Sequence, residues 1–131
     1  MIERTTTHGV QIEVESRFVP ENSDADHGQF LFAYEIRITN TTESRVQLLN
    51  RHWIITDGLG RIEEVKGPGV IGQQPWIAPG ETFEYESFCP LTTPTGSMRG
   101  SYEMTSLSES SPTTFSAEIP QFFLVEPGSF H

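Results

Sequence analysis

The amino-acid sequence predicts an all-β protein built as an antiparallel β-sandwich of about seven to eight strands. In most segments between turns, hydrophobic and polar residues alternate with a period of two, which is typical of strands that bury one face. No window of about 11 residues has the spacing of an amphipathic helix. Short segments rich in Gly, Pro, Asn and Asp separate the alternating runs, as expected for neighbouring strands joined by turns.

Length and composition fit a single domain covering residues 1–131. Of the 131 residues, 35% are hydrophobic and 20% are charged, which is typical of a globular protein. The formal net charge is −10, and the eight Lys and Arg residues form no basic run. An acidic protein repels phosphate backbones, and no apolar run approaches about 20 residues, so neither nucleic acid nor a membrane is an expected partner. The single cysteine and the lack of a secretory signal predict a cytoplasmic location.

The N-terminal half is expected to contain four strands. Residues 1–7 are polar and are predicted to form a flexible tail. Strands are predicted at 8–18 and 29–39, with a polar loop between them. Residues 45–57 are apolar at both parities, which predicts a central strand or a strand with a bulge near Leu48 and Leu49. The turn Asp57-Gly58-Leu59-Gly60 then leads into a short charged strand at 61–66, suited to a sheet edge.

The C-terminal half begins with a long ordered loop at 67–80, which holds four glycines and three prolines. Strands are predicted at 81–88, 98–104 and 115–124, with turns at 89–96 and 106–113. A bulge or an edge break is expected at Pro120, because proline cannot donate a ladder hydrogen bond. Residues 127–131 are predicted to be a second flexible tail.

One motif invites a nucleotide-binding interpretation. Gly67, Gly69 and Gly72 form a Gly-x-Gly-x-x-Gly pattern, which indicates a dinucleotide site only between a strand and a helix. Pro75 and Pro79 exclude a helix after it, so a Rossmann site is not expected. Two interpretations remain: the glycine N–H groups form an anion-binding nest, or the glycines permit positive φ angles and let the loop pack on the sandwich.

Other candidate chemical groups favour structural roles. Asp24, Asp26 and His27 share a flexible loop without a preorganised cage, which indicates solvated side chains rather than a metal site. His52 lies on an apolar strand, where a satisfied structural histidine is expected. Cys89 has no basic neighbour to lower its pKa. We therefore predict no catalytic residue, no metal ligands and no cofactor, and we do not expect an enzyme.

Trp76 is an aromatic residue that does not fall on the predicted buried face of any strand. It lies between prolines on the glycine-rich loop. Either it plugs the end of the sandwich, or it is exposed and anchors a partner.

The Gly, Pro and aromatic residues also follow a specific spacing over nearly the whole chain. The segments are Arg51-His52-Trp53-Ile54-Ile55-Thr56-Asp57, Glu64-Val65-x-Gly67-x-Gly69-Val70-x-Gly72-x-Gln74-Pro75, Pro79-Gly80-Glu81-x-Phe83-x-Tyr85-x-Ser87, Thr93-Pro94-x-Gly96-x-Met98-x-Gly100-x-Tyr102-x-Met104 and Ile119-Pro120-x-Phe122-x-Leu124. In this spacing the chain resembles the ApaG family.

The resemblance implies a fibronectin type III or immunoglobulin-like β-sandwich in a bacterial cytosolic protein with no established catalytic activity. Bacterial members, also called CorD, are associated with cobalt resistance and magnesium efflux. Similar domains in some F-box proteins and in a DNA-polymerase-delta-interacting protein look like protein-interaction modules. The glycine motif of the family also carries a suggestion of pyrophosphate or nucleotide binding.

Two positions depart from the family pattern. Pro68 stands where members usually have Glu, so a carboxylate there is not essential in this chain. Phe88 stands where Gly is common and adds apolar surface near Cys89.

The expected function is that of a non-enzymatic module that binds an unidentified protein. The candidate surfaces are a sheet edge, which would also allow a homodimer, and the 67–80 loop with Trp76. The alternative is a small-ligand binder that holds pyrophosphate, a nucleotide or a divalent cation through Gly67, Gly69, Gly72 and Gln74.

Overall fold

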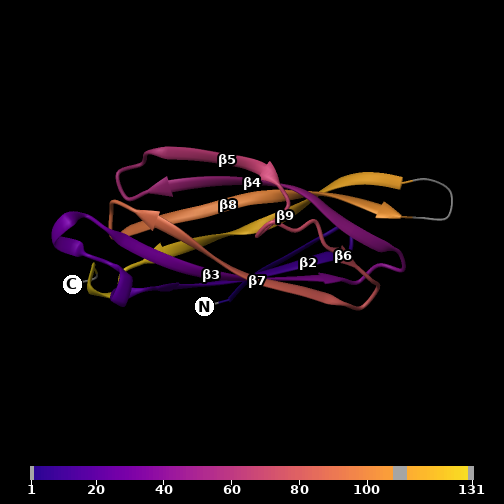
Figure 1. Cartoon of the computed structure of the whole chain (residues 1–131), viewed down its shortest axis with the longest axis horizontal. Helices are drawn as coiled ribbons and strands as arrows, with labels where there is room; N and C mark the ends of the chain where they lie inside the picture. The colour runs from indigo at the N-terminus through magenta and orange to yellow at the C-terminus, as the bar shows by residue number, and fades with distance from the viewer. Residues whose placement is uncertain (1, 108–111, 130–131) are drawn as a thin grey trace.

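A computed structural model describes residues 2–107 and 112–129 and folds them into two antiparallel sheets packed face to face (Figure 1). The first sheet has the order β1 (Ile2–Thr7), β2 (Val10–Phe18), β3 (Phe30–Asn40), β7 (Thr82–Leu91). The second has the order β5 (Ile62–Pro68), β4 (Arg45–Asp57), β8 (Thr95–Leu107), β9 (Pro112–Val125), and β6 (Trp76–Ile77) also pairs with β4. The predicted β-sandwich of the fibronectin type III kind is confirmed.

The helical segments in the described part of the chain are single 3-10 turns. They are η1 (Pro20–Asn22), η2 (Ala25–His27) and η3 (Pro127–Ser129). The first two lie in the predicted polar loop before β3. The third lies within the predicted C-terminal tail, whose last two residues fall outside the described residues.

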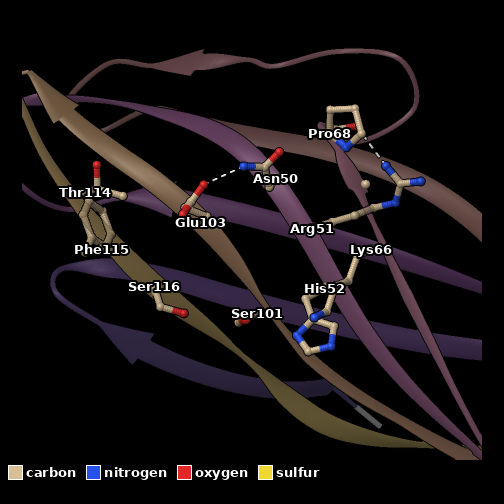
Figure 2. A pocket seen from close by; sticks show the side chains of 11 residues that line it. Asn50, Arg51, His52, Lys66, Pro68, Ser101, Glu103, Thr114, Phe115 and Ser116 are labelled. Carbon is tan, nitrogen blue, oxygen red and sulfur yellow. Dashed lines mark hydrogen bonds between the residues drawn. The ribbon is translucent and has the colours of Figure 1, made fainter.

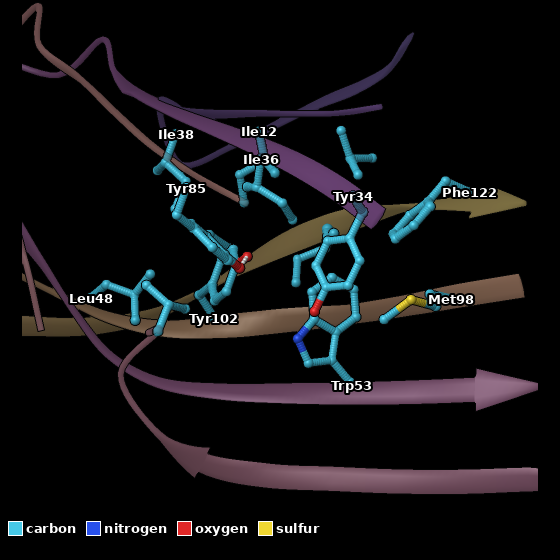
Figure 3. Close-up of a cluster of buried hydrophobic side chains, with 14 of the residues drawn as sticks. Ile12, Tyr34, Ile36, Ile38, Leu48, Trp53, Tyr85, Met98, Tyr102 and Phe122 are labelled. Carbon is cyan, nitrogen blue, oxygen red and sulfur yellow. Dashed lines mark hydrogen bonds between the residues drawn. The ribbon is translucent and has the colours of Figure 1, made fainter. Parts of the chain in front are cut away.

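Alternation along the strands fills the space between the sheets. On β3 the inward residues Phe32, Ile36 and Ile38 are fully buried, and β2 lies beside it with Val10, Ile12 and Val14. Four aromatic rings form the centre of the core, with Trp53 contacting Tyr34, Phe122 and Tyr102 at centroid distances of 5.4, 5.9 and 6.4 Å (Figure 3).

Both predicted irregularities are present. In the β4–β8 pair the register shifts between Leu48 and Asn50, so Leu49 is an extra residue in β4. In the β8–β9 pair Met98 faces Phe122 whereas Gly100 faces Ile119, which places an extra residue of β9 at Pro120 or Gln121. Each bulge changes which later residues point into the core.

Three boundaries differ from the sequence prediction. Residues 2–7 are not a frayed tail: they form β1, whose mixed polar residues gave no apolar alternation to detect. β7 continues to Leu91 instead of turning at Cys89, because an edge strand tolerates Pro90. The 67–80 segment is interrupted by the two-residue strand β6. The turn predicted at 106–113 lies largely outside the described residues.

The two lateral sides of the sandwich differ. On the side that we call closed, β9 packs against β1 and β2, the Thr7 hydroxyl accepts a hydrogen bond from the Glu118 N–H (3.2 Å), and the Ser16 hydroxyl donates to the Phe123 carbonyl (2.8 Å). On the side that we call open, the edge strands are β5 and β7, and a cleft enters between the sheets.

A candidate binding cleft at the open side

The glycine motif ends in a tight turn at the mouth of the cleft. Val70 and Gln73 exchange two backbone hydrogen bonds of 2.8 and 2.9 Å. Between them Ile71 and Gly72 have φ angles of +44° and +76°, as in a type I′ turn. A β-branched residue rarely adopts a positive φ, so Ile71 is held in a strained conformation.

The extra residue of β4 anchors this loop. The Leu49 carbonyl accepts hydrogen bonds from the Gly69 N–H (2.8 Å) and from the Gln74 side-chain amide (2.9 Å). Gly69 has a φ of +62°, and a Cβ there would lie 2.2 Å from the Gln73 carbonyl oxygen. The loop can therefore close only with glycine at position 69.

The motif also forms a socket for the Arg51 side chain. Arg51 Nη1 donates hydrogen bonds to the carbonyls of Pro68 (2.9 Å) and Gly69 (3.0 Å), and Figure 2 shows the bond to Pro68. A Cβ at Gly67 would lie 3.0 Å from the Arg51 guanidinium. The carbonyls of the motif thus face a cation that belongs to the chain itself.

Arg51 points into the sandwich. Cross-strand pairing places it opposite the fully buried Tyr102 on β8, and its neighbour of the same parity is the buried Trp53. This orientation follows from the bulge, because Leu48 and Arg51 are three positions apart yet share one face. An arginine is thereby placed at an inward position beside the aromatic core.

The cleft next to Arg51 has a volume of about 570 Å³. Its walls come from both sheets and expose polar and apolar surface in similar amounts, and the exposed residues Ile71 and Phe88 border it. The lining includes Tyr34, Trp53, Ile55, Val65, Val70, Tyr85, Ser87, Cys89 and Met98. A cleft that brings apolar side chains together with a few polar groups is a candidate binding site.

Burial favours the neutral forms of the thiol and the phenols beside the cleft, because it raises their pKa values. Burial raises the pKa of the Cys89 thiol to about 11, with a smaller contribution from the Glu63 charge. Burial also raises the pKa of Tyr85 and Tyr102, whose hydroxyls hydrogen-bond to each other. A thiol held in its protonated form is a poor nucleophile.

A second depression, of about 700 Å³, lies on the outer face of the β5–β4–β8–β9 sheet (Figure 2). Its principal polar side chains are already paired: the Asn50 amide donates to Glu103 (2.5 Å), and His52 Nε2 lies 2.8 Å from a Glu64 oxygen.

The four predicted ligand residues have different roles in the structure. The N–H of Gly69 is bonded to the Leu49 carbonyl, and the Gln74 side-chain amide donates one of its two N–H groups to the same carbonyl, so these two donors are already used. Gly67 makes room for Arg51, and Gly72 lies at the exposed turn. The packing interpretation of the motif describes these residues better than a preformed nest does.

Trp76, the predicted partner anchor, does not plug the sandwich. It is 42% exposed, and the Arg45 guanidinium lies 4.7 Å from its ring centroid. One edge of β4 is paired with β8, so β5 and β6 both pair with the other edge. Trp76 on β6 therefore lies on the open side, but it does not line the cleft.

The remaining candidates have the surroundings expected of structural groups. Cys89 is buried, and His52 is paired with Glu64. His27 Nδ1 lies 2.6 Å from an Asp24 oxygen in the loop before β3. Over residues 2–107 and 112–129, no three His, Cys, Asp or Glu side chains are grouped so that they could hold a metal ion.

Sequence reasoning missed Arg51, Ile71 and Ser87 as residues of a site. The signal for Arg51 was available in part, since a bulge near Leu48 and Leu49 shifts the parity of everything after it. Ile71 gave no signal, because a positive φ at isoleucine is not expected from sequence.

The fold defines a fibronectin type III-like β-sandwich domain with a lateral cleft. The model of the ApaG domain matches residues 20–106. The chain is 50% identical to the protein ApaG of Bdellovibrio bacteriovorus, over 99% of this chain and 100% of that protein, and 49% identical to that of Bordetella pertussis, over 95% and 92%. This chain belongs to the ApaG family.

Solved structures agree with this assignment. A Bordetella pertussis protein named ApaA in its crystal structure superposes with a TM-score of 0.85 at 50% identity, covering 90% of this chain and 94% of that one. The C-terminal domain of wzt, with a TM-score of 0.55 and 10% identity, shares the fold alone. No helix in the described residues is long and apolar enough to cross a membrane.

Proposed function

We propose that this chain is a non-enzymatic protein-interaction module that recognises its partner through the surface around the cleft. The observation that carries the proposal is a pair of exposed apolar residues that border the cleft, Ile71 and Phe88, which are 54% and 52% exposed. Alternation along β7 directs the Phe88 side chain to the outer face of its sheet, next to the cleft. Exposed apolar side chains gathered at a cleft are typical of interaction sites. Ile71 is also kept in a strained conformation, and such strain is concentrated at functional positions.

A role without catalysis agrees with the chemistry of the cleft. Its one thiol is held protonated by burial, with a pKa raised to about 11. Its hydroxyl groups have no histidine beside them among the lining residues. The cleft therefore supplies shape and a positive charge rather than a nucleophile and a base.

The role in cobalt resistance and magnesium efflux would then be indirect, exerted in the cytoplasm by binding a protein. The carbonyls of Pro68 and Gly69 accept hydrogen bonds from the chain's own Arg51, so these two acceptors of the glycine motif already face a cation. Homodimer formation through the edge of β5 or β7 would use the same side of the molecule, and light scattering at high concentration tests it.

Site-specific photo-crosslinking in bacterial cells tests the proposed surface. A benzoylphenylalanine in place of Phe88 is expected to capture a defined protein. In place of Phe123 on the closed side, which is 62% exposed, it is expected to capture none. The captured band should disappear when Ile71→Asp is added, because a charge at the mouth opposes apolar docking.

Equal labelling from both positions, or none from position 88, would contradict the proposal. NMR titration with pyrophosphate, ATP and Mg²⁺ tests the competing small-ligand function. Saturable shifts confined to residues 67–74 would favour that function instead.

A further inference from the structure

Arg51 is a partly buried cation without an acidic partner. Among the described residues Arg4 pairs with Glu13, Arg37 with Glu35, and Arg61 with Asp57. The arginines without a carboxylate partner among these residues are exposed, apart from Arg51, which is partly buried; the exposed ones are Arg17, Arg45 and Arg99. Arg51 makes no ion pair there and bonds only to two backbone carbonyls. Carbonyl dipoles orient the guanidinium, but its charge is not neutralised, and a charge removed from water is normally compensated.

The space beside Arg51 suits a carboxylate attached to an apolar group. A guanidinium has five N–H donors, and the two recorded bonds use only Nη1. The adjoining walls are formed by Trp53, Val65 and Met98, with the Ser87 hydroxyl on β7. Arginine in such a setting binds carboxylates through paired hydrogen bonds.

The two strands that flank the cleft are edge strands. Among the strands that the structure describes, β5 pairs only with β4, and β7 pairs only with β3. An extended segment that joins either edge directs every second side chain towards the space between the sheets. A segment of this kind can place an apolar side chain and a carboxylate in the cleft at positions two residues apart.

We propose that the cleft receives an extended segment of a partner protein, whose aliphatic or aromatic side chain contacts the apolar wall and whose Glu or Asp side chain, two residues away, pairs with Arg51. This inference rests on the proposed interaction function and names the chemistry of its partner. Charge favours one carboxylate at Arg51, whereas the net charge of −10 and the nearby Glu63 disfavour a polyanion.

Selection from a phage-displayed library of random peptides tests this chemistry without assuming a partner. The wild-type chain is expected to enrich peptides with Glu or Asp two positions from an aliphatic or aromatic residue. The Arg51→Gln chain should lose the enrichment of the acid, and the Arg99→Gln chain, changed at an exposed arginine outside the cleft, should keep it.

Titration of one enriched peptide, acetylated and amidated, measures the size of the effect. Changing its acid to the amide should weaken binding about 10-fold or more to the wild-type chain, and by less than about 2-fold to Arg51→Gln. The comparison of the two peptides on each chain removes any general loss caused by a loosened loop.

A second pair of variants leaves Arg51 in place. Val65→Phe fills the cleft and should abolish binding, while Lys66→Phe adds the same ring to the opposite face of β5 and should not. The NMR shift changes that the peptide causes in the protein should include those of Trp53 and Ser87.

Three results would overturn the inference: no enriched peptides, an acid preference that survives Arg51→Gln, or binding that requires a free terminal carboxylate. If crosslinking at position 88 persists while any of these is observed, the carboxylate pairing is wrong and the interaction function stands. Loss of the crosslink as well would remove both.

Discussion

Two turns with similar positive φ angles lie on opposite sides of the sandwich and carry different residues. In the β1–β2 turn, His8 and Gly9 have φ angles of +50° and +77°; in the open-side turn, Ile71 and Gly72 have +44° and +76°. Histidine is among the residues that tolerate this region, and its ring packs on Phe115 at 5.5 Å. Isoleucine is not, and its side chain stands exposed at the cleft.

The difference indicates what each side is built to do. On the closed side, the residues with positive φ angles are of types that tolerate them. Contacts on this side also join the two sheets. The open side keeps a residue that costs about 1–2 kcal/mol in its backbone conformation and presents that residue to the surroundings. Stability alone does not explain Ile71, and its exposed position fits the partner contact that we propose.

The largest expected effect concerns two phenylalanines, one on each side. Phe122→Ala removes a ring that contacts Trp53 and Tyr34 and should lower the free energy of unfolding by about 3–5 kcal/mol. Phe88→Ala should change it by less than about 0.5 kcal/mol, since that ring is half exposed. Urea unfolding of both variants measures the contrast, and comparable losses would show that the open side also carries the core.

The next effect is a loss of stability at alkaline pH. The pKa of the Cys89 thiol is about 9 in the unfolded chain and is raised to about 11 in the folded state. The protonated thiol therefore makes its full contribution to the free energy of unfolding below pH 9, and this contribution is lost as the pH rises to 11. The loss should reach as much as about 3 kcal/mol, and the buried tyrosines add to it in the same direction above pH 10.

Chemical unfolding from pH 8 to 11 measures this slope, with Cys89→Ser as the control. That variant should have a shallower slope between pH 9 and 11 whatever its stability at pH 8. An unchanged slope would show that water reaches the thiol through the cleft.

Two glycines of the motif separate the packed and exposed parts of the open side. Gly69→Ala should lower the free energy of unfolding by about 2 kcal/mol or more, because the added Cβ meets the Gln73 carbonyl. Gly72→Ala has nothing within 4 Å and should cost about 1 kcal/mol for its positive φ. Equal costs, measured by thermal or urea unfolding, would mean that the loop is less closely packed than its hydrogen bonds indicate.

The smallest effect is a gain. Ile71→Asn should stabilise the fold by about 1 kcal/mol, since asparagine tolerates the left-handed region, while His8→Asn should be nearly neutral. The same Ile71→Asn change should weaken the crosslink from position 88. A stabilised protein with undiminished crosslinking would separate Ile71 from partner binding.

Period-two patterns predicted most of the strands, their buried faces and both bulges, because burial of one face imposes alternation directly on the sequence. They did not predict β1, whose residues on this outer edge are polar on both faces. They also did not predict the orientation of Arg51. A charged residue at an inward position contradicts the pattern, and only the extra residue at Leu49 together with the carbonyls of the glycine loop makes it acceptable.

The anchoring of the loop on the Leu49 carbonyl has a consequence for insertions and deletions. Removing Leu49 would give β4 a regular register with β8 and leave the same residues facing the core, since Leu48 and Arg51 would then be two positions apart. It would, however, remove the acceptor that holds Gly69 and Gln74. The length of one strand thus controls the position of a loop elsewhere in the sequence, so a one-residue deletion can abolish the proposed recognition in a protein that still folds.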